Sequence, residues 1–467
     1  MSLIEHPEIG VSIDTSHMNI PPFNPTEWEQ VLQAMQALEN GAIANPTENR
    51  MVGHYWLRNP SLYPSMQAEI LESWRALTLL KVKIQERNIE TLLMVGIGGS
   101  ALGPQFLYDA LPSRGLKLCF IDNTDPQSID RTLDSLDLSK TLVVVLSKSG
   151  GTKETRNGML EVQRRYQRDQ SLNFAEHAIA VTVPGSALDE KAKEEGWFGR
   201  LPLWDWVGGR TSITGMVGLL PLALMNCDWA KFLEGASKMD EWTRQSENNP
   251  ALWLAHAWLE SGKGKGDKAM VVLPYKDSLG LFGRYLQQLI MESIGKKHDR
   301  DGNEVHQGLT VYGNKGSTDQ HAFVQQLRDG RNDFFATLIA VLKTHSHSFG
   351  KVIVEGETID SGTYLLGFLL GTRKALTEAD RDVMTLVIDE VDEFHLGALI
   401  ALYERAVGFY AERLNLNAYD QPGVEAGKKA ASGQLLLFEQ LLKAEEIENA
   451  DPSDMWLWKA HIARNNL

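Results

Sequence analysis

The sequence predicts an α/β protein built from two tandem, doubly wound, parallel-sheet domains with helical N- and C-terminal segments. Its 467 residues exceed what one hydrophobic core usually organises, so two domains are expected. From residue 91 onward, short apolar runs alternate with helix-length polar stretches, which is the pattern of a parallel sheet covered by helices. The alternation stops at the Gly- and Lys-rich turn GKGKGDK, residues 262–268, and then restarts. That turn is the expected domain boundary.

Residues 1–90 are expected to form an N-terminal helical segment. Trp and Leu recur at helical spacing in residues 27–40 and 66–84, and prolines interrupt the pattern at 21–25.

The first sheet domain is expected at residues 91–260. Its predicted strands are 92–97, 116–121, 142–146 and 178–183. Each run ends in a loop of glycine, aspartate, serine or proline, and a helical stretch at 211–258 completes the domain.

The second sheet domain is expected at residues 267–405. Its predicted strands are 269–273, 309–312, 334–341 and 351–354. From residue 390 the pattern is again helical, and residues 406–467 are expected to form a C-terminal helical segment.

Composition narrows the class of protein. A formal charge of −15 would repel a phosphate polymer, so no nucleic-acid partner is expected. Cys119 and Cys227 lie far apart in apolar settings, which predicts neither a disulfide nor a metal pair and fits a reducing compartment. The N-terminus lacks the basic and apolar run of a signal peptide, and no segment has the ~18 uncharged apolar residues of a membrane span. A cytoplasmic protein is expected.

The loop SKSGGT follows the predicted strand at 142–146 and precedes a helix. Ser147, Ser149 and Thr152 offer hydroxyls, and Gly150 lets the backbone approach a ligand closely. The helix start adds unpaired N–H groups and the positive end of a dipole, so an anion, most plausibly a phosphate, is expected. An ordinary capped turn is the alternative.

The earlier loop, VGIGGSALGP, admits two interpretations. Gly96, Gly98 and Ala101 match a relaxed dinucleotide-binding fingerprint, and Asp122 follows where a ribose-binding acid would stand, which suggests a nicotinamide-dependent dehydrogenase. Asp122 also fits a turn cap. Because the ends of parallel strands share one edge, this loop and SKSGGT could instead converge on one small phosphate.

Two charged side chains are candidates for catalysis. Arg210 follows two glycines in WVGGRTS, which suits close contact with an oxyanion, unless it is a surface arginine paired with Asp205. Glu292 lies on a predicted helix, residues 285–296, among apolar neighbours, which suits a partly desolvated general base. A solvated glutamate near a helix end is the alternative.

Two further candidates lie in glycine-rich loops. His321 stands at a helix start after GNKGSTDQ, and because a histidine side chain can donate or accept a proton it suits acid–base work; a partly buried histidine hydrogen-bonded to a cap is the alternative. Lys428 follows the turn in DQPGVEAGK and otherwise reads as a solvated lysine. Four histidines lack a ligand set and are not expected to bind metal: His298, His306, His345 and His347.

The order of these motifs resembles the glucose-6-phosphate isomerase family, in its compact bacterial form. The matching stretches are GIGGSALGP, SKSGGTKET, WVGGRTS, QQLIMESIGK, GNKGSTDQHAFVQQLRDG and QPGVEAGK. They span nearly the whole chain. Two departures are Ile294, where many members carry asparagine, and SKSGG in place of the SKTFT of other members; both leave the candidate side chains in position.

The resemblance implies two sugar isomerase (SIS) domains that interconvert glucose 6-phosphate and fructose 6-phosphate without metal or organic cofactor. Glu292 would move the proton between C2 and C1, Arg210 would stabilise a cis-enediolate, and His321 with Lys428 would open the sugar ring. The implied substrate and phosphate contacts are Gly99, Ser100, Ser147, Lys148, Ser149, Thr152 and Gln421. A homodimer is implied, with His321 contributed to the neighbouring subunit's site.

Three functions therefore compete on the sequence. The isomerase accounts for one base, one cation and one ring-opening acid. A non-catalytic sugar-phosphate sensor would need the loops alone, and the dehydrogenase would need a nicotinamide cofactor.

Overall fold

The computed structural model describes residues 3–343, 353, 356, 358–443, 445, 447 and 450–466. The chain divides into two compact units, Met1–Tyr419 and Asp420–Leu467. No helix in these described ranges is both long enough and apolar enough to cross a membrane.

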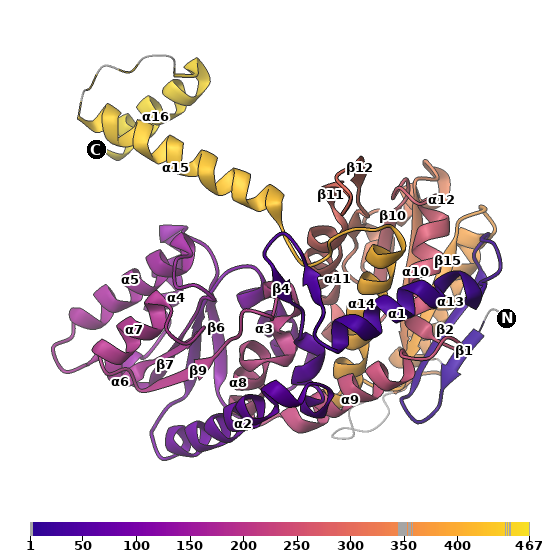
Figure 1. Ribbon diagram of the computed structural model, residues 1–467, viewed down its shortest axis with the longest axis horizontal. Helices are drawn as coiled ribbons and strands as arrows, with labels where there is room; N and C mark the ends of the chain where they lie inside the picture. The colour runs from indigo at the N-terminus through magenta and orange to yellow at the C-terminus, as the bar shows by residue number, and fades with distance from the viewer. Residues whose placement is uncertain are drawn as a thin grey trace. The chain divides into compact units, whose positions relative to one another are not determined.

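The first sheet, in the larger unit, has five parallel strands in the order β6-β5-β7-β8-β9 (Figure 1). They are β5 (Thr91–Val95), β6 (Lys117–Ile121), β7 (Thr141–Leu146), β8 (Ala178–Thr182) and β9 (Gly199–Pro202). The four predicted strands are confirmed, and β9 adds an unpredicted edge. Alternate residues of β5 enter two different apolar clusters, Leu92 on one face and Leu93 on the other, so both faces are covered.

Helices follow these strands as a doubly wound sheet requires. They are α3 (Gly99–Ala110), α4 (Pro126–Asp134), α5 (Lys153–Gln167) and α7 (Ala187–Glu194). The next segments are η5 (Gly209–Thr214) and α8 (Met216–Leu224), and both pack on α3.

The second sheet has six strands in the order β1-β2-β15-β14-β10-β13. Its parallel part is β10 (Ala269–Pro274), β13 (Val311–Tyr312), β14 (Phe334–Val341) and β15 (Val383–Ile388). The predicted strands at 269–273, 309–312 and 334–341 are confirmed, whereas β15 was not predicted. The predicted strand at 351–354 lies outside the described residues except for Ile353, which forms an isolated bridge with Asp360.

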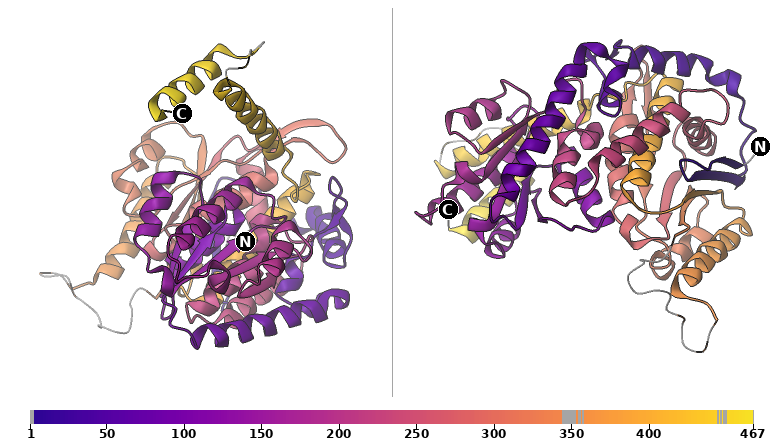
Figure 2. Two further views of the ribbon diagram at one scale, coloured as in Figure 1. Left: turned by 90° about the vertical axis from the view of Figure 1, so that its left-hand side faces the viewer. Right: turned by 90° about the horizontal axis from the view of Figure 1, so that it is seen from below.

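The N-terminal segment differs from its helical prediction. Its first strands, β1 (Leu3–His6) and β2 (Val11–His17), form a hairpin, and β2 pairs antiparallel with β15 of the second sheet (Figure 2). Helical structure follows only in α1 (Glu29–Glu39) and α2 (Pro64–Gln85). The hairpin is stabilised by pairing with a strand more than three hundred residues away, which local spacing does not reveal.

Three helices carry the core shared by the two sheets: α9 (Trp229–Trp242), α10 (Pro250–Ser261) and α14 (Glu393–Arg413). One apolar cluster includes Met94 of the first sheet, Met384 of the second and most of these helices. The first unit therefore folds around a common interior.

A buried ion cluster ties the N-terminal segment to these helices. Arg58 pairs with Asp240 at 2.8 Å and with Glu404. Arg405 pairs with Asp240 at 3.1 Å and with Glu39. All five side chains are almost wholly removed from solvent, and opposite charges within hydrogen-bonding range offset the cost of burying them.

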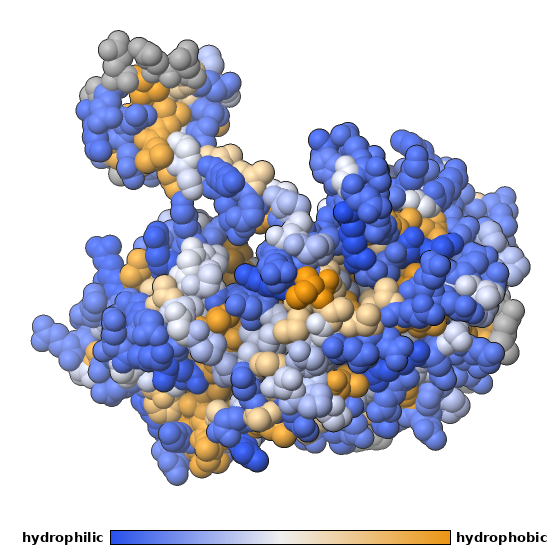
Figure 3. All heavy atoms as spheres, in the orientation of Figure 1, coloured by the Kyte–Doolittle hydropathy of each residue, from blue (hydrophilic) through white to orange (hydrophobic). Residues whose placement is uncertain are grey.

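The second unit is a pair of helices, α15 (Pro422–Leu442) and α16 (Pro452–Asn465), which confirms the predicted C-terminal helices. The rings of Phe438 and Trp458 pack at 4.8 Å, and the Trp458 indole donates to Gln434 at 3.1 Å. Several apolar side chains of this unit stay exposed (Figure 3): Val424, Leu435, Leu436, Leu442, Trp456 and Leu457.

Candidate active site

An arginine and a glutamate predicted for chemistry form an ion pair. Arg210 Nη1 lies 2.7 Å from Glu292 Oε2. The Arg210 side chain is 5% exposed and that of Glu292 24% exposed, so the carboxylate edge still faces solvent while the guanidinium is buried. Arg210 Nη2 also donates to the Ala418 carbonyl at 3.0 Å. The alternatives of a surface arginine and a fully solvated glutamate are therefore wrong.

Glu292 ends an unusual helical turn. The helix α11 (Phe282–Leu286) continues as the π-helical η7 (Gln287–Glu292), a wider coil often found at functional sites. Gln288 donates its amide to Glu292 Oε2 at 3.2 Å, and Lys296 Nζ caps the Glu292 carbonyl at 2.8 Å. One carboxylate oxygen, Oε2, is thus held by both an amide and a guanidinium.

The glycines before α3 permit three segments to meet. A Cβ on Gly99 would lie 2.0 Å from the Gly209 carbonyl oxygen, and one on Gly98, whose φ is +60°, would lie 3.2 Å from Gln288 Nε2. Glycine is therefore required by close backbone approach at Gly99 and by a left-handed φ at Gly98. Ser100 lies in the first turn of α3 at this meeting point.

The loop after β7 has the form of an anion cradle. Ser147 Oγ accepts the Gly150 N–H at 3.0 Å and Ser149 Oγ accepts the Gly151 N–H at 3.1 Å. Ser149 Oγ keeps its proton for donation to a ligand, whereas the Ser147 hydroxyl also donates to Thr152 Oγ1 at 3.4 Å. Thr152 is the N-cap of the 15-residue helix α5, and its side chain makes no cap bond, so the helix start keeps free N–H capacity.

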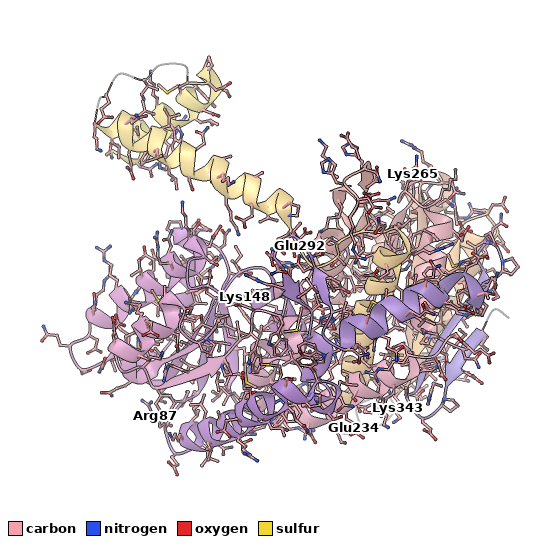
Figure 4. The ribbon with its side chains drawn as sticks, in the orientation of Figure 1. Arg87, Lys148, Glu234, Lys265, Glu292 and Lys343 are labelled. Atoms are coloured by element: carbon pink, nitrogen blue, oxygen red, sulfur yellow. The ribbon has the colours of Figure 1, made fainter. Side chains whose placement is uncertain are left out.

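Lys148 of the same loop bonds to protein carbonyls. Its Nζ donates to Asp205 O at 2.7 Å and to Val207 O at 3.0 Å. Burial, and then the nearby charge of Arg50, lowers the pKa of Lys148 to about 8. Figure 4 labels Lys148 and Glu292 near the middle of the first unit.

The acid of the dinucleotide interpretation is engaged by a side chain. Asp122 Oδ2 accepts the Gln105 amide at 2.8 Å, and Asp125, not Asp122, caps α4. The helix side of the glycine loop is lined by Gln288 and Gly209. The loop therefore packs against the Glu292 helix and the Arg210 segment.

Within the described residues, His321 makes no hydrogen bond or ion pair with Arg210 or Glu292. It ends the short turn η8 (Asp319–His321), and its side chain is exposed and makes no hydrogen bond within the described part of the chain. The loop is rigid beneath it, because the Asp319 carboxylate accepts the N–H groups of Asn314 at 2.9 Å and Lys315 at 3.1 Å. The alternative of a partly buried histidine bonded to a cap is therefore wrong, and the buried side chain of this turn is Asp319.

Gln421 and Lys428 belong to the second unit. Lys428 lies on α15 and pairs with the exposed Glu425 at 2.6 Å, and Gln421 precedes the first residue of that helix.

The sequence did not predict the segment Asn417–Tyr419, which holds Arg210. Ala418, whose carbonyl accepts from Arg210, follows Asn417, which donates to Asn45 at 3.0 Å and to Thr47 at 2.9 Å. Asn45 in turn donates to the Tyr419 carbonyl at 3.2 Å. Asparagines in an irregular segment were the only available signal.

The cysteines and histidines have structural explanations. Cys119 and Cys227 are free thiols, and burial raises the pKa of Cys227 to about 11. His298 and His306 are exposed, and His306 pairs with Glu304 at 2.6 Å, whereas His345 and His347 lie outside the described residues. One group of acids with a histidine in metal-ligand proximity is a helix cap of α14: Glu390, Asp392 and His395.

A sequence model of the family described as phosphoglucose isomerase matches residues 23–359 and 369–457. The glucose-6-phosphate isomerase of Nostoc sp. is 54% identical over 448 residues, covering 91% of this chain and 84% of the relative. That of Geobacter sp. is 53% identical over 450 residues, covering 92% and 84%. A crystal structure of a glucose-6-phosphate isomerase from Chlamydia trachomatis matches with a TM-score of 0.87 and 26% identity, over 99% of this chain and 93% of that one.

Proposed function

The chain belongs to the phosphoglucose isomerase family, and on that premise we propose which of its residues carry the reaction. The enzyme interconverts glucose 6-phosphate and fructose 6-phosphate, a step of glycolysis and carbohydrate metabolism. The observation that carries the assignment of roles is the 2.7 Å contact between Arg210 and Glu292.

Glu292 is the base that moves the proton. An aldose becomes a ketose when one carboxylate removes the proton on C2 and returns it to C1, while the hydroxyl proton on O2 passes to O1, so that C2 becomes the carbonyl. Glu292 ends a helix, is oriented by Gln288, and has an exposed edge that a sugar carbon could approach.

Arg210 stabilises the charge that forms. Removal of the C2 proton leaves a cis-enediolate whose oxygens carry negative charge, and a buried guanidinium beside them lowers the barrier. Arg210 suits this role because its side chain is buried and fixed by Glu292 and the Ala418 carbonyl.

The loop after β7 binds the phosphate. The hydroxyls of Ser147, Ser149 and Thr152 and the start of α5 are the anchoring groups, and Gly99 and Ser100 line the sugar site from α3. Anchoring the remote phosphate lets binding energy align the reacting carbons with Glu292. This chemistry needs no metal or organic cofactor.

His321 opens the sugar ring together with Lys428, while Gln421 contacts substrate. We assign His321 to the neighbouring subunit's site in a homodimer. Its exposure on a rigid loop supports this, as do exposed apolar side chains on α13 (Ser361–Thr377), namely Leu366, Phe368 and Leu370. Apolar faces of this kind are typical of subunit interfaces.

The same proposal places the enzyme in the cytoplasm, which fits two free thiols and no disulfide among the described residues. It divides the chain into an N-terminal segment (1–90), a domain with the phosphate loops (91–260), a domain with Glu292 and His321 (267–405) and a C-terminal segment (406–467).

The test follows fructose 6-phosphate by proton NMR in deuterated water with the purified protein. Glucose 6-phosphate carrying deuterium at C2 is expected, because a proton held on a carboxylate exchanges with solvent. With Glu292→Gln, signals of bound sugar should persist while conversion stops. Conversion at the wild-type rate would contradict the role of Glu292.

A further inference from the structure

Three consecutive backbone carbonyls leading to Arg210 are held by neighbouring segments. Lys148 Nζ donates hydrogen bonds to the carbonyls of Asp205 and Val207, and the Gly53 N–H donates to the carbonyl of Trp206 at 2.9 Å. The Trp206 ring also packs between Trp204 at 5.0 Å and Trp56 at 5.1 Å. Residues 205–207 are thus held both by the N-terminal segment, through Gly53 and Trp56, and by the phosphate loop, through Lys148.

After these held residues, only two glycines separate Val207 from Arg210. A Cβ on Gly209 would meet no atom within 4 Å, but the Gly209 carbonyl lies against Gly99 and accepts the Ser212 hydroxyl at 2.8 Å. Glycine permits the widest range of backbone angles. The place where Arg210 begins therefore depends on where residues 205–207 are held, together with the contact of Gly209 with α3.

The backbone of Lys148 is anchored as well. The Lys148 carbonyl accepts the Val183 N–H at 3.2 Å and the Thr182 hydroxyl at 3.3 Å, which fixes its backbone to the end of β8. Ser147 and Ser149 flank it in the proposed phosphate site. One lysine side chain thus joins the phosphate loop to the segment that delivers the proposed enediolate-stabilising arginine.

We propose that Lys148 is a positioning residue for Arg210, and that its side chain is not a ligand of the substrate phosphate. Through it, a phosphate that orders the loop also orders residues 205–207 and hence the guanidinium. This inference rests on the roles proposed for Arg210 and the loop. It departs from the phosphate contact that the family resemblance implied for Lys148.

The charges around Lys148 agree with this function. An ammonium donates up to three hydrogen bonds, and two of them satisfy carbonyls that would otherwise lose their partners. The ion pair of Arg50 and Glu48 (3.2 Å) and the carboxylate of Asp205 are the charges that face it. Arg50 disfavours the charged form, and the two carboxylates favour it.

The test compares Lys148→Met, Lys148→Arg and a control, Lys140→Met, at neutral pH. Lys140 directly precedes β7, at the end of that strand opposite the phosphate loop, and pairs with Glu90 on the surface. The measured quantities are kcat and KM for fructose 6-phosphate and the inhibition constant of inorganic phosphate. Circular dichroism and the unfolding midpoint show whether each variant folds.

For Lys148→Met, we expect kcat to fall by about tenfold or more, and KM and phosphate inhibition to change by less than about threefold, since an interaction used mainly in the transition state is lost. Lys148→Arg, which keeps the donors, should recover most of kcat, and Lys140→Met should match the wild type. An unchanged kcat with KM and the phosphate constant raised about tenfold would make Lys148 a phosphate ligand and overturn the proposal.

The pH profile gives a second readout that does not depend on how well Lys148→Met folds. The kcat of the wild type should decline above about pH 8, where Lys148 loses its proton, and this decline should move to higher pH in Lys148→Arg. An identical decline in both proteins contradicts the proposal.

Arg210→Lys separates failure of this inference from failure of the proposed site. If Arg210→Lys keeps wild-type turnover, the role of Arg210 itself is wrong. If Arg210→Lys loses turnover but Lys148→Met does not, the site assignment stands and the link through Lys148 is wrong.

Discussion

The guanidinium of Arg210 lies 2.7 Å from the carboxylate of Glu292, although the two side chains come from segments that follow different sheets. Arg210 reaches the site from η5, which follows the last strand of the five-stranded sheet, and Glu292 from η7, which follows β10 of the six-stranded sheet. The proposed reacting pair is therefore assembled only when both sheets and the segment at Ala418 are in place.

Replacing Glu292 by glutamine removes the proposed base with almost no change in shape. We expect kcat to fall by about 10²–10⁴-fold, because the amide cannot accept the C2 proton. Inhibition by inorganic phosphate should stay within about twofold of wild type, since the loop after β7 is untouched. Glu304→Gln, on an exposed strand, is the matched control and should keep full activity. A loss of phosphate binding equal to the loss of kcat would contradict the assignment.

A mixture of two inactive variants tests the homodimer. In a dimer of Glu292→Gln with His321→Ala subunits, one site carries both changes and the other carries neither, if His321 serves the partner. Unfolding and refolding an equal mixture should restore about a quarter of wild-type activity, because half the dimers are mixed and each has one intact site.

The control for that experiment is each variant refolded alone, which should remain inactive. Light scattering must give twice the chain mass. Absence of recovered activity from a mixture that does form dimers would place His321 and Glu292 of one chain in the same site.

Breaking the buried ion cluster should cost much more than breaking a surface pair. Glu404→Gln leaves Arg58 with one carboxylate partner in a region closed to water, and we expect unfolding free energy to drop by about 3–5 kcal/mol. Glu72→Gln breaks an exposed pair with Arg75, whose side chain is 74% exposed, and should change it by less than about 1 kcal/mol. Urea unfolding measures both, and equal effects would contradict the picture of a structural cluster.

Lys148 should leave a signature in the pH dependence of stability. Its pKa is lowered from 10.5 to about 8 in the folded protein, so between these values the unfolded chain binds the extra proton. The free energy of unfolding contributed by this group therefore rises as pH rises through that window, and is lost below it. Urea unfolding of wild type and Lys148→Met across the window gives the difference, wild type minus variant. A difference that falls with rising pH would show that the pKa is raised instead.

Much of the molecule could be predicted because its signals are local. Continuous apolar runs such as Thr141–Leu146 predicted strands buried on both faces. Glycine, hydroxyl and charged residues directly after such runs predicted the loops at the ends of the strands. Family membership removes the dehydrogenase and sensor alternatives, and the Gln105 contact gives Asp122 a structural function. The Arg210–Glu292 pair combined two residues that the sequence had selected separately.

What escaped prediction depends on distant partners. The strands β1 and β2 are short and carry polar residues, and they become a sheet edge only by pairing with β15. The carbonyl of Ala418 carries no side-chain signal, and the direction of the Lys148 ammonium, toward carbonyls and not outward, follows from the fold of residues 205–207.

The pairing of β2 with β15 also affects how the protein is made. Ribosomes release a chain from its N-terminus, so Val11–His17 must wait until Val383–Ile388 has been synthesised before that sheet edge can close. At ordinary elongation rates the wait is on the order of half a minute. Throughout that time the nascent residues Leu3–His17 lack the strand that completes their sheet edge in the folded protein.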